Sequence, residues 1–250
     1  MPMIRKRSLA LVWVPVMLSV WAECAMAQSS SDSRVAVTVS AGARPTASDF
    51  SQFVSFEAYS EQGSLTTSYA VKQQPLLNVG IVGRIWHGLG AGVDGTYLHN
   101  SFPAQITALV PHPLIANQPR TVSGNATVSN RQLAMHLEAV YWIRRSDRLE
   151  VLATGGPSLV QADQDFVTDV SYTQTFPYNT ATFAGAAIGR QRKSALGANV
   201  GAQVGWRLKG PLGVAGLVRY SHVTYHLPTI GAASVPLGGL DVGGGIRLLF

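Results

Sequence analysis

The residues best suited to chemistry in this sequence are charged side chains on the polar side of alternating segments. These residues are Arg84, Asp94, Glu138, Glu150, Arg207, Arg219, Asp241 and Arg247. An enclosed charge is costly unless it is paired and hydrogen-bonded. We therefore predict that these side chains form a network of arginine–carboxylate pairs that fills the interior of the protein. The alternative is a narrow pore lined by the same charges.

Histidine and serine could supply a general base and a nucleophile for a hydrolase that acts on lipids. The candidates are His99, His136, His222, Ser101 and Ser221. No fixed spacing marks a catalytic triad among them. The sequence therefore predicts no enzyme and no catalytic residues, and a hydrolase is the third hypothesis for function.

Three aspartates in one connection, Asp163, Asp165 and Asp169, could offer oxygen ligands to calcium. The spacing of a calcium-binding EF-hand loop is absent, so solvated acids are the expected state. We predict neither a metal site nor a cofactor.

The elements that must position these residues alternate between apolar and polar side chains with a period of two. The segment 196–208 shows the pattern well, with Val200, Val204 and Trp206 on one face and Asn199 and Gln203 on the other. Such alternation is typical of a strand with two different faces. After residue 27 no apolar run approaches the ~18 residues of a membrane helix. Eight strands are predicted: 34–43, 75–87, 88–99, 130–144, 148–161, 194–208, 211–225 and 237–250.

The connections between these strands alternate in length. Tight turns are expected around 87–88, 145–147 and 209–211, and longer connections at 44–74, 100–130, 162–194 and 226–236. Within the first long connection, turn residues Glu61-Gln62-Gly63 predict a hairpin. Short turns at one end and long loops at the other indicate an antiparallel up-and-down transmembrane β-barrel that is all-β. In such a barrel the apolar face contacts lipid.

The first residues resemble an export signal. Arg5, Lys6 and Arg7 precede a thirteen-residue apolar stretch, 9–21, and Ala25-Met26-Ala27 offers a cleavage site. We predict a cleavable signal peptide over 1–27 and a barrel domain over 28–250. Cys24 lies within the signal, so the mature chain would have no cysteine for disulfides or thiolate metal sites.

Composition narrows the class of partner. Charged residues make up only 13% of the chain, and its formal net charge of +6 would fall to +4 without 1–27. The positive charges are scattered, so no nucleic-acid partner is predicted. Three of them, Arg190, Arg192 and Lys193, could contact lipopolysaccharide phosphates.

The last ten residues, 241–250, resemble the assembly signal of outer-membrane barrels, in which apolar residues alternate before a terminal aromatic. Ile246, Leu248 and Phe250 carry that resemblance. The mature chain as a whole resembles the OmpA/OmpX-like class of small, single-domain outer-membrane β-barrel proteins. The resemblance implies a bacterial outer-membrane location with both termini in the periplasm. It also implies as partners the barrel assembly machinery, outer-membrane lipid and lipopolysaccharide.

The class includes structural proteins, adhesins, channels and enzymes, so the resemblance leaves the activity open. From the residues we predict a structural or surface-interaction barrel with a lumen plugged by side chains. An external ligand is not identified by the sequence.

Overall fold

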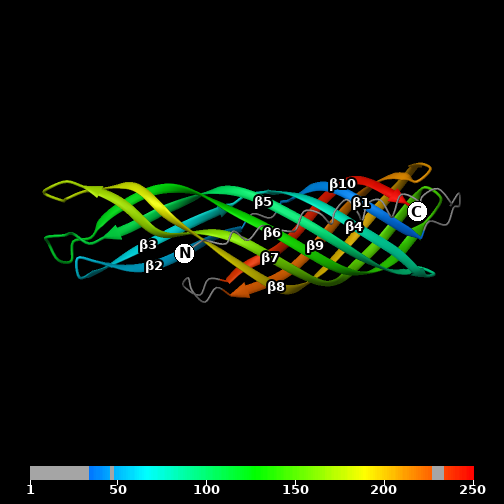
Figure 1. Ribbon diagram of the computed structural model, residues 1–250, viewed down its shortest axis with the longest axis horizontal. Coiled ribbons are helices and arrows are strands. Elements are labelled where there is room, and N and C mark those ends of the chain that lie inside the picture. Colours follow the sequence, from blue (N-terminus) through cyan, green and yellow to red (C-terminus); the bar gives the residue numbers. More distant parts are fainter. Residues whose placement is uncertain (1–33, 46–47, 227–233) are drawn as a thin grey trace, which may run out of the picture.

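The computed structural model describes residues 34–45, 48–226 and 234–250, and the regular elements within them are all strands (Figure 1). No helix in these ranges is long and apolar enough to cross a membrane. The predicted signal peptide lies outside the described residues. The ten strands are β1 (Val35–Arg44), β2 (Ser48–Ala58), β3 (Glu61–Val71), β4 (Gln74–Trp86), β5 (Leu89–Val110), β6 (Arg120–Arg145), β7 (Leu149–Gln174), β8 (Ala181–Lys209), β9 (Leu212–His226) and β10 (Ser234–Leu249).

Eight of the strands close into a ring. The order is β5-β4-β1-β10-β9-β8-β7-β6, and β6 pairs back onto β5. All neighbours are antiparallel, and β1 closes the ring against β10 from Ala36 opposite Leu249 to Ala43 opposite Val242. Closure leaves no free strand edge in this part, as lipid requires of a β-protein. The predicted eight-stranded antiparallel barrel is confirmed.

The alternation between inward and outward side chains persists along β5 and β6, but its polarity reverses part-way. On the outer face of β6, apolar Leu133 and Leu137 are followed beyond Arg131 by polar Thr127 and Ser123. The inner face changes in the opposite sense. On β5, buried Asp94 and Thr96 give way to buried Phe102 and Ile106. The point of reversal marks one edge of the apolar belt that faces lipid.

Beyond the belt, the strands continue into segments that the sequence analysis had assigned to long connections. β5 extends to Val110, β6 begins at Arg120, and β7 and β8 approach each other again at Gln174 and Ala181. The expected pattern was apolar outside and polar inside, and that pattern ends where the surrounding medium changes to water. The strands do not end there, because outward polar and inward apolar side chains suit a water-exposed wall equally well.

The hairpin of β2 and β3 completes this outer part, which lies at the left of Figure 1. Its turn is Tyr59-Ser60, where both residues have positive φ, rather than the predicted Glu61–Gly63. β3 pairs with β5 between Ser64–Tyr69 and Ala104–Leu109. Side chains of the hairpin and of β5 to β8 enclose an apolar core. Its fully buried large members include Leu65, Tyr69, Ile106, Val110, Val122 and Phe166.

The opposite end of the barrel consists of tight turns and both described ends of the chain. The backbone N–H groups of Arg34 and Val35 donate to the carbonyl of Phe250 at 2.8 and 3.1 Å. Register shifts occur beside all three turns, between Arg84 and Trp86, Trp142 and Arg144, and Arg207 and Lys209. Such bulges re-aim side chains. Trp86, which strict alternation would direct inward, is therefore exposed, whereas Trp142 packs against the interior.

The lipid-facing belt can be tested by moving a positive charge along the outer face of β6. Leu137→Arg, near the middle of the belt, should destabilise the folded barrel in lipid vesicles by about 2–4 kcal/mol. Ser123→Arg, on the same face but beyond the belt, should cost less than about 0.5 kcal/mol. Urea unfolding followed by the heat-dependent gel shift of the folded barrel measures both. Equal costs would contradict the assigned belt edge.

Candidate functional site

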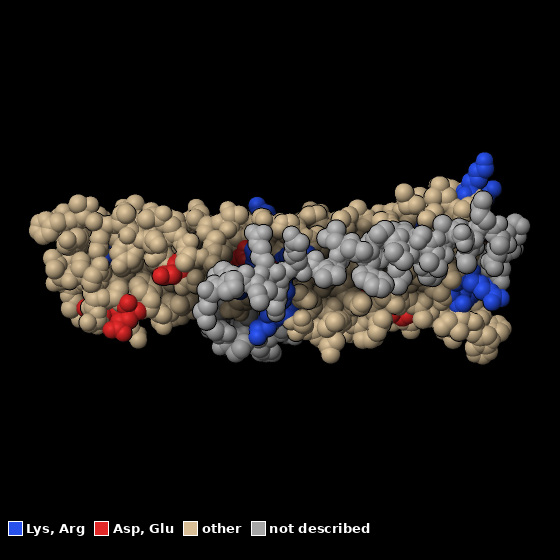
Figure 2. Space-filling view, viewed as in Figure 1, with Lys and Arg blue, Asp and Glu red and all other residues tan. Residues whose placement is uncertain are grey.

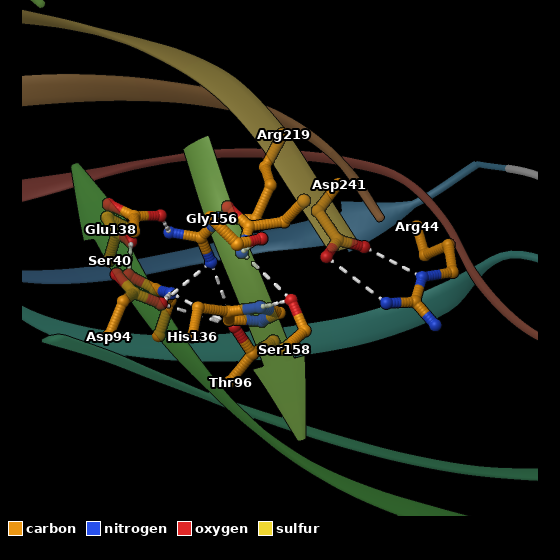
Figure 3. Close-up of polar contacts among 12 residues, drawn as sticks. Ser40, Arg44, Asp94, Thr96, His136, Glu138, Gly156, Ser158, Arg219 and Asp241 are labelled. Atoms are coloured by element: carbon orange, nitrogen blue, oxygen red, sulfur yellow. Dashed lines mark hydrogen bonds and ion pairs between the residues drawn. The ribbon is translucent and has the colours of Figure 1, made fainter. Parts of the chain in front are cut away.

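The centre of the lumen holds an arginine between two carboxylates (Figure 3). Arg219, on β9, has 0% of its side chain exposed, and its Nη1 donates to Asp94 Oδ1 over 2.7 Å. Its Nη2 lies 2.9 Å from Glu138 Oε1, but the N–H is not directed at that oxygen, so this contact is an ion pair rather than a hydrogen bond. β5, β6 and β9 each contribute one member. We call these three residues the central triad.

Neutral side chains hold the Asp94 carboxylate in place. The Asn78 amide donates to Asp94 Oδ1 and, over 3.1 Å, to the Thr96 hydroxyl. On neighbouring β4, Gly80 leaves space for the carboxylate, because an added Cβ would lie 2.5 Å from Asp94 Oδ2. The central triad therefore depends on a small residue opposite a charged one, an arrangement suited to a narrow barrel.

A second group lies nearer the outer edge of the belt. Arg44 binds Asp241 with two hydrogen bonds, Nε to Oδ1 at 2.7 Å and Nη2 to Oδ2 at 3.1 Å, and its Nη1 donates to Gln132 over 3.0 Å. Asp241 is among the predicted lumen charges but Arg44 is not, because the predicted first strand ends at residue 43. Continuing the inward positions Thr38, Ser40 and Gly42 by one step would have identified it.

A third group lies near the tight turns. Buried Arg247 donates from Nη2 to Glu150 Oε2 over 3.0 Å, and Arg145 lies 3.6 Å from the other oxygen of Glu150. Two further predicted lumen charges, Arg84 and Arg207, are only half-buried at this end, and both have interacting partners. Six of the eight predicted lumen charges are thus buried, in three separate groups rather than one network.

The hydrolase candidates are divided between the interior and the outer face of the barrel. His136 is buried, and its Nδ1 is 2.7 Å from the Ser158 hydroxyl, which also accepts a hydrogen bond from Asn199. Ser101 is exposed on the outer face, whereas Ser221 is buried in the lumen. His99 and His222 are both exposed. The polar contacts of His136 belong to the packed interior, whereas His99 and Ser101 both lie on the exposed face of β5.

Two small recesses lie beside the buried lumen charges. One recess lies within the belt beside Asn78 and Asp94, and a second lies between the tight turns beside Arg247; each has a volume of about 10 Å³. Such a volume suits a single water molecule. Farther out, the apolar core fills the space between the walls with side chains such as Phe102, Ile106 and Val160. Within the described residues, the lumen thus holds paired charges in the belt and apolar side chains beyond it.

Two of the three candidate calcium ligands are paired with arginine at the outer edge of the belt. Arg192 contacts Asp163 at 2.6 and 3.0 Å, and Arg190 contacts Asp165 at 2.8 and 3.3 Å. These hydrogen bonds hold the pKa of both carboxyl groups below the usual range. Asp169 accepts instead from the Val170 backbone N–H. No group of three or more potential metal ligands occurs in the described part of the chain.

Comparison with known proteins finds likeness only at the level of structure. No protein-family model and no curated protein sequence matches the chain. Neisserial surface protein A matches 86% of this chain and 97% of its own, with 14% identity and a TM-score of 0.44. The outer membrane protein OprG from Pseudomonas aeruginosa matches 87% of this chain and 94% of its own, with 10% identity and a TM-score of 0.41. The outer membrane protease OmpT from Escherichia coli matches 87% and 97%, with 8% identity and a TM-score of 0.41.

All these solved structures are small outer-membrane β-barrels, the class that the sequence resembles. The low identities and TM-scores carry no conclusion about activity. The function must therefore be argued from the chain's own side chains.

Removing the cation of the central triad should lower the free energy of unfolding, because its carboxylates would remain buried without a partner. Arg219→Met leaves Asp94 and Glu138 buried without their cation and should destabilise the barrel by about 3–5 kcal/mol. Adding Asp94→Asn and Glu138→Gln removes the unpaired charges, so the triple variant should recover part of that loss. Urea unfolding in vesicles measures both. A single variant as stable as the parent would contradict the role of Arg219 as an obligatory partner.

Proposed function

We propose that this chain is a bacterial outer-membrane β-barrel without a transport pathway, which serves a structural role or acts through contacts at its outer surface. The observation that carries the proposal is the double closure of its interior. Ion pairs of the central triad and of Arg44 with Asp241 fill the lumen within the belt, and an apolar core fills the part beyond. A hydrated solute would have to displace both. This weighs against the alternative of a narrow pore.

The orientation is part of the proposal. Tight turns and both described chain ends gather at one end of the barrel, and the other end carries the β2–β3 hairpin and the longer described connections β5–β6 and β7–β8 (Figure 1). Outer-membrane barrels place short turns in the periplasm and long connections outside. We therefore place Arg34 and Phe250 in the periplasm, consistent with export by a signal peptide. Phe250 would be read there by the assembly machinery.

The outer end is an ordered surface, which we call the apex: residues 58–61, 111–120 and 174–181. Arg120 ties two of its tips together, donating to Gln174 over 2.6 Å and to the Pro111 carbonyl over 2.8 Å. Gln174 in turn donates to the Tyr59 hydroxyl over 2.8 Å, which attaches the third tip. A rigid apex loses little conformational entropy when it binds, which supports a role in surface contacts.

The same apex leaves large apolar side chains in solvent. Leu114 is 67% exposed and Phe176 is 75% exposed. The Leu114 turn is fixed by buried His112, whose Nδ1 accepts the backbone N–H groups of Leu114 and Ile115 at 3.1 Å each. Exposed apolar residues on an ordered surface favour a role in binding another protein over a role that is limited to closing the end of the barrel.

The absence of transport is tested in planar lipid bilayers. The folded barrel should produce no discrete conductance steps over the accessible voltage range. Arg219→Met should stay equally silent, because the apolar core closes the outer part independently of the triad. Discrete steps in the parent protein would overturn the proposal in favour of the pore. Steps in the variant alone would show that the apolar core does not seal.

The orientation is tested with single cysteines, because residues 28–250 contain none. In intact cells, Asn117→Cys at the apex should react with a membrane-impermeant maleimide. Asp147→Cys at a tight turn should react only after the cells are broken open. Both residues are exposed in the structure, so their reactivity reports the side of the membrane. The reversed pattern would invert the proposed topology.

A further inference from the structure

The tight-turn end of the barrel carries a surplus of positive charge on two neighbouring turns. Strands β7 and β8 are paired, so the β6–β7 and β8–β9 turns meet, and the Arg207 N–H donates to the Arg148 carbonyl over 2.8 Å. We call the charged residues on and beside these turns the turn cluster. It contains six cations, Arg144, Arg145, Arg148, Arg207, Lys209 and Arg247, and two carboxylates, Asp147 and Glu150, a net charge of +4. Figure 2 shows Lys and Arg side chains at this end of the molecule.

Internal pairing uses only part of this charge. Glu150 is buried and is shared between Arg247 and Arg145. By contrast, Arg144, Arg148 and Lys209 are exposed, and none of these three side chains forms an ion pair within the described residues. The surplus is therefore available at the surface.

Two β-bulges direct members of the turn cluster toward the lipid-facing surface. Without the bulge after Trp142, Arg144 would point into the lumen, but it lies opposite Val151 on the outward face. After a second bulge, Lys209 lies opposite outward-facing Leu212. Residues directly opposite in an antiparallel pair point to the same side of the sheet. Both cations therefore continue the lipid-facing surface just past the apolar belt.

The neighbours of these cations locate them at the membrane interface. Outward-facing Tyr141 and Trp206 are exposed directly above them on β6 and β8, and such rings mark the headgroup level. Lipid phosphates lie at that level. Guanidinium and ammonium groups bind phosphate oxygens through charge-assisted hydrogen bonds.

We infer that the turn cluster is a binding site for the phosphate of an anionic phospholipid headgroup. A net charge of +4 is not neutralised by a zwitterionic headgroup, whose own ammonium group would be repelled. The small recess between the turns, lined by Ser146, Arg148 and Arg247, adds donors behind the site, because Arg247 Nε and Nη1 have no hydrogen-bond partner in the described structure. The recess has room for one water molecule, so the phosphate would lie across its opening.

The other edge of the apolar belt is a matched contrast. It carries Arg190, Arg192 and Lys193, but Asp165 and Asp163 already bind both arginines with two contacts each. Its charge is largely compensated by these carboxylates. The two edges thus carry similar numbers of cations, but at the outer edge carboxylates already bind the arginines, whereas at the tight turns several cations are left to bind an added anion.

The test uses the folded full barrel in vesicles of phosphatidylethanolamine with a minority of phosphatidylglycerol. After mild detergent release, native mass spectrometry counts each lipid that remains bound. The parent protein should retain phosphatidylglycerol well above its share in the vesicle. The variant Arg144→Gln/Arg148→Gln/Lys209→Gln should retain at least about tenfold less, because each cation at a membrane surface contributes to anionic-lipid binding. The heat-dependent gel shift confirms that the variant is folded.

Two controls make the result specific. Arg190→Gln/Arg192→Gln/Lys193→Gln removes the same charge from the opposite edge and should change retention by less than about twofold. Arg144→Lys/Arg148→Lys preserves charge and should preserve retention. Equal losses in the two triple variants, or no preference for phosphatidylglycerol in the parent, would overturn the inference.

A last arm separates a lipid site from a site for free phosphate. Inorganic phosphate is compared with sodium chloride at equal ionic strength. Retention of phosphatidylglycerol in phosphate supports the lipid, whereas complete displacement of the lipid by millimolar inorganic phosphate would make free phosphate the preferred ligand and overturn the inference. The membrane leaflet of the site rests on the orientation proposed above. Because lipid retention does not depend on conductance or on cysteine labelling, failure here is distinguishable from failure of the proposed function.

Discussion

The structure depends on a wall whose strands must satisfy all of their backbone hydrogen bonds where the surroundings are lipid. Only closure into a ring achieves this for strands, and an eight-stranded ring has an interior just wide enough for side chains. Closure also fixes which residues point inward, because side chains alternate strictly between bulges. Everything inside the belt must therefore be packed, paired or hydrogen-bonded. The three groups around Arg44, Arg219 and Arg247 are the result of that constraint.

The same strands pass from lipid into water, and their alternation between inward and outward side chains continues without a shift. β6 keeps His136 and Val122 on its inner face although the first lies within the belt and the second beyond it. In lipid the outer face must be apolar, which leaves the interior to polar residues. In water the outer face can be polar, which frees the interior for an ordinary apolar core. The polar filling within the belt and the apolar filling beyond it thus have different physical causes.

This reversal also explains what could be predicted from sequence. The eight ring strands were recognisable because apolar-out alternation is regular from Leu133 to Ile143 and from Leu196 to Leu208. Their outer continuations escaped recognition because the same alternation has opposite polarity there. The pairing of β3 with β5, from Ser64 to Tyr69, has no local signal at all, since it joins segments far apart in the chain.

Among the site residues, position in the alternation was more informative than residue type. Asp94, Glu138 and Arg219 were predicted correctly because they lie on the polar face of regularly alternating strands. Arg44 was missed by one residue at a strand end. A strict period-two pattern would direct Arg144 inward, because such a pattern cannot show a bulge. Bulges, like partner choice, depend on the geometry of the whole ring rather than on local sequence.

If the interior is closed as proposed, function must reside at the two ends of the barrel, and the surfaces of these ends differ in chemistry. At the apex, Arg120 is buried, and its Nη1 and Nη2 groups donate hydrogen bonds that hold hairpin tips together. The exposed surface therefore consists largely of apolar side chains such as Leu114 and Phe176. At the tight turns, the bulges turn cations outward in excess of the carboxylates available to them. For insertion into the membrane alone, the bulge that directs Arg144 outward has one benefit, which is that it removes one buried charge from the lumen. The exposed cations beside it, Arg148 and Lys209, face no such burial cost, so relief of burial does not explain why positive charge gathers there, whereas a phosphate at the headgroup level does.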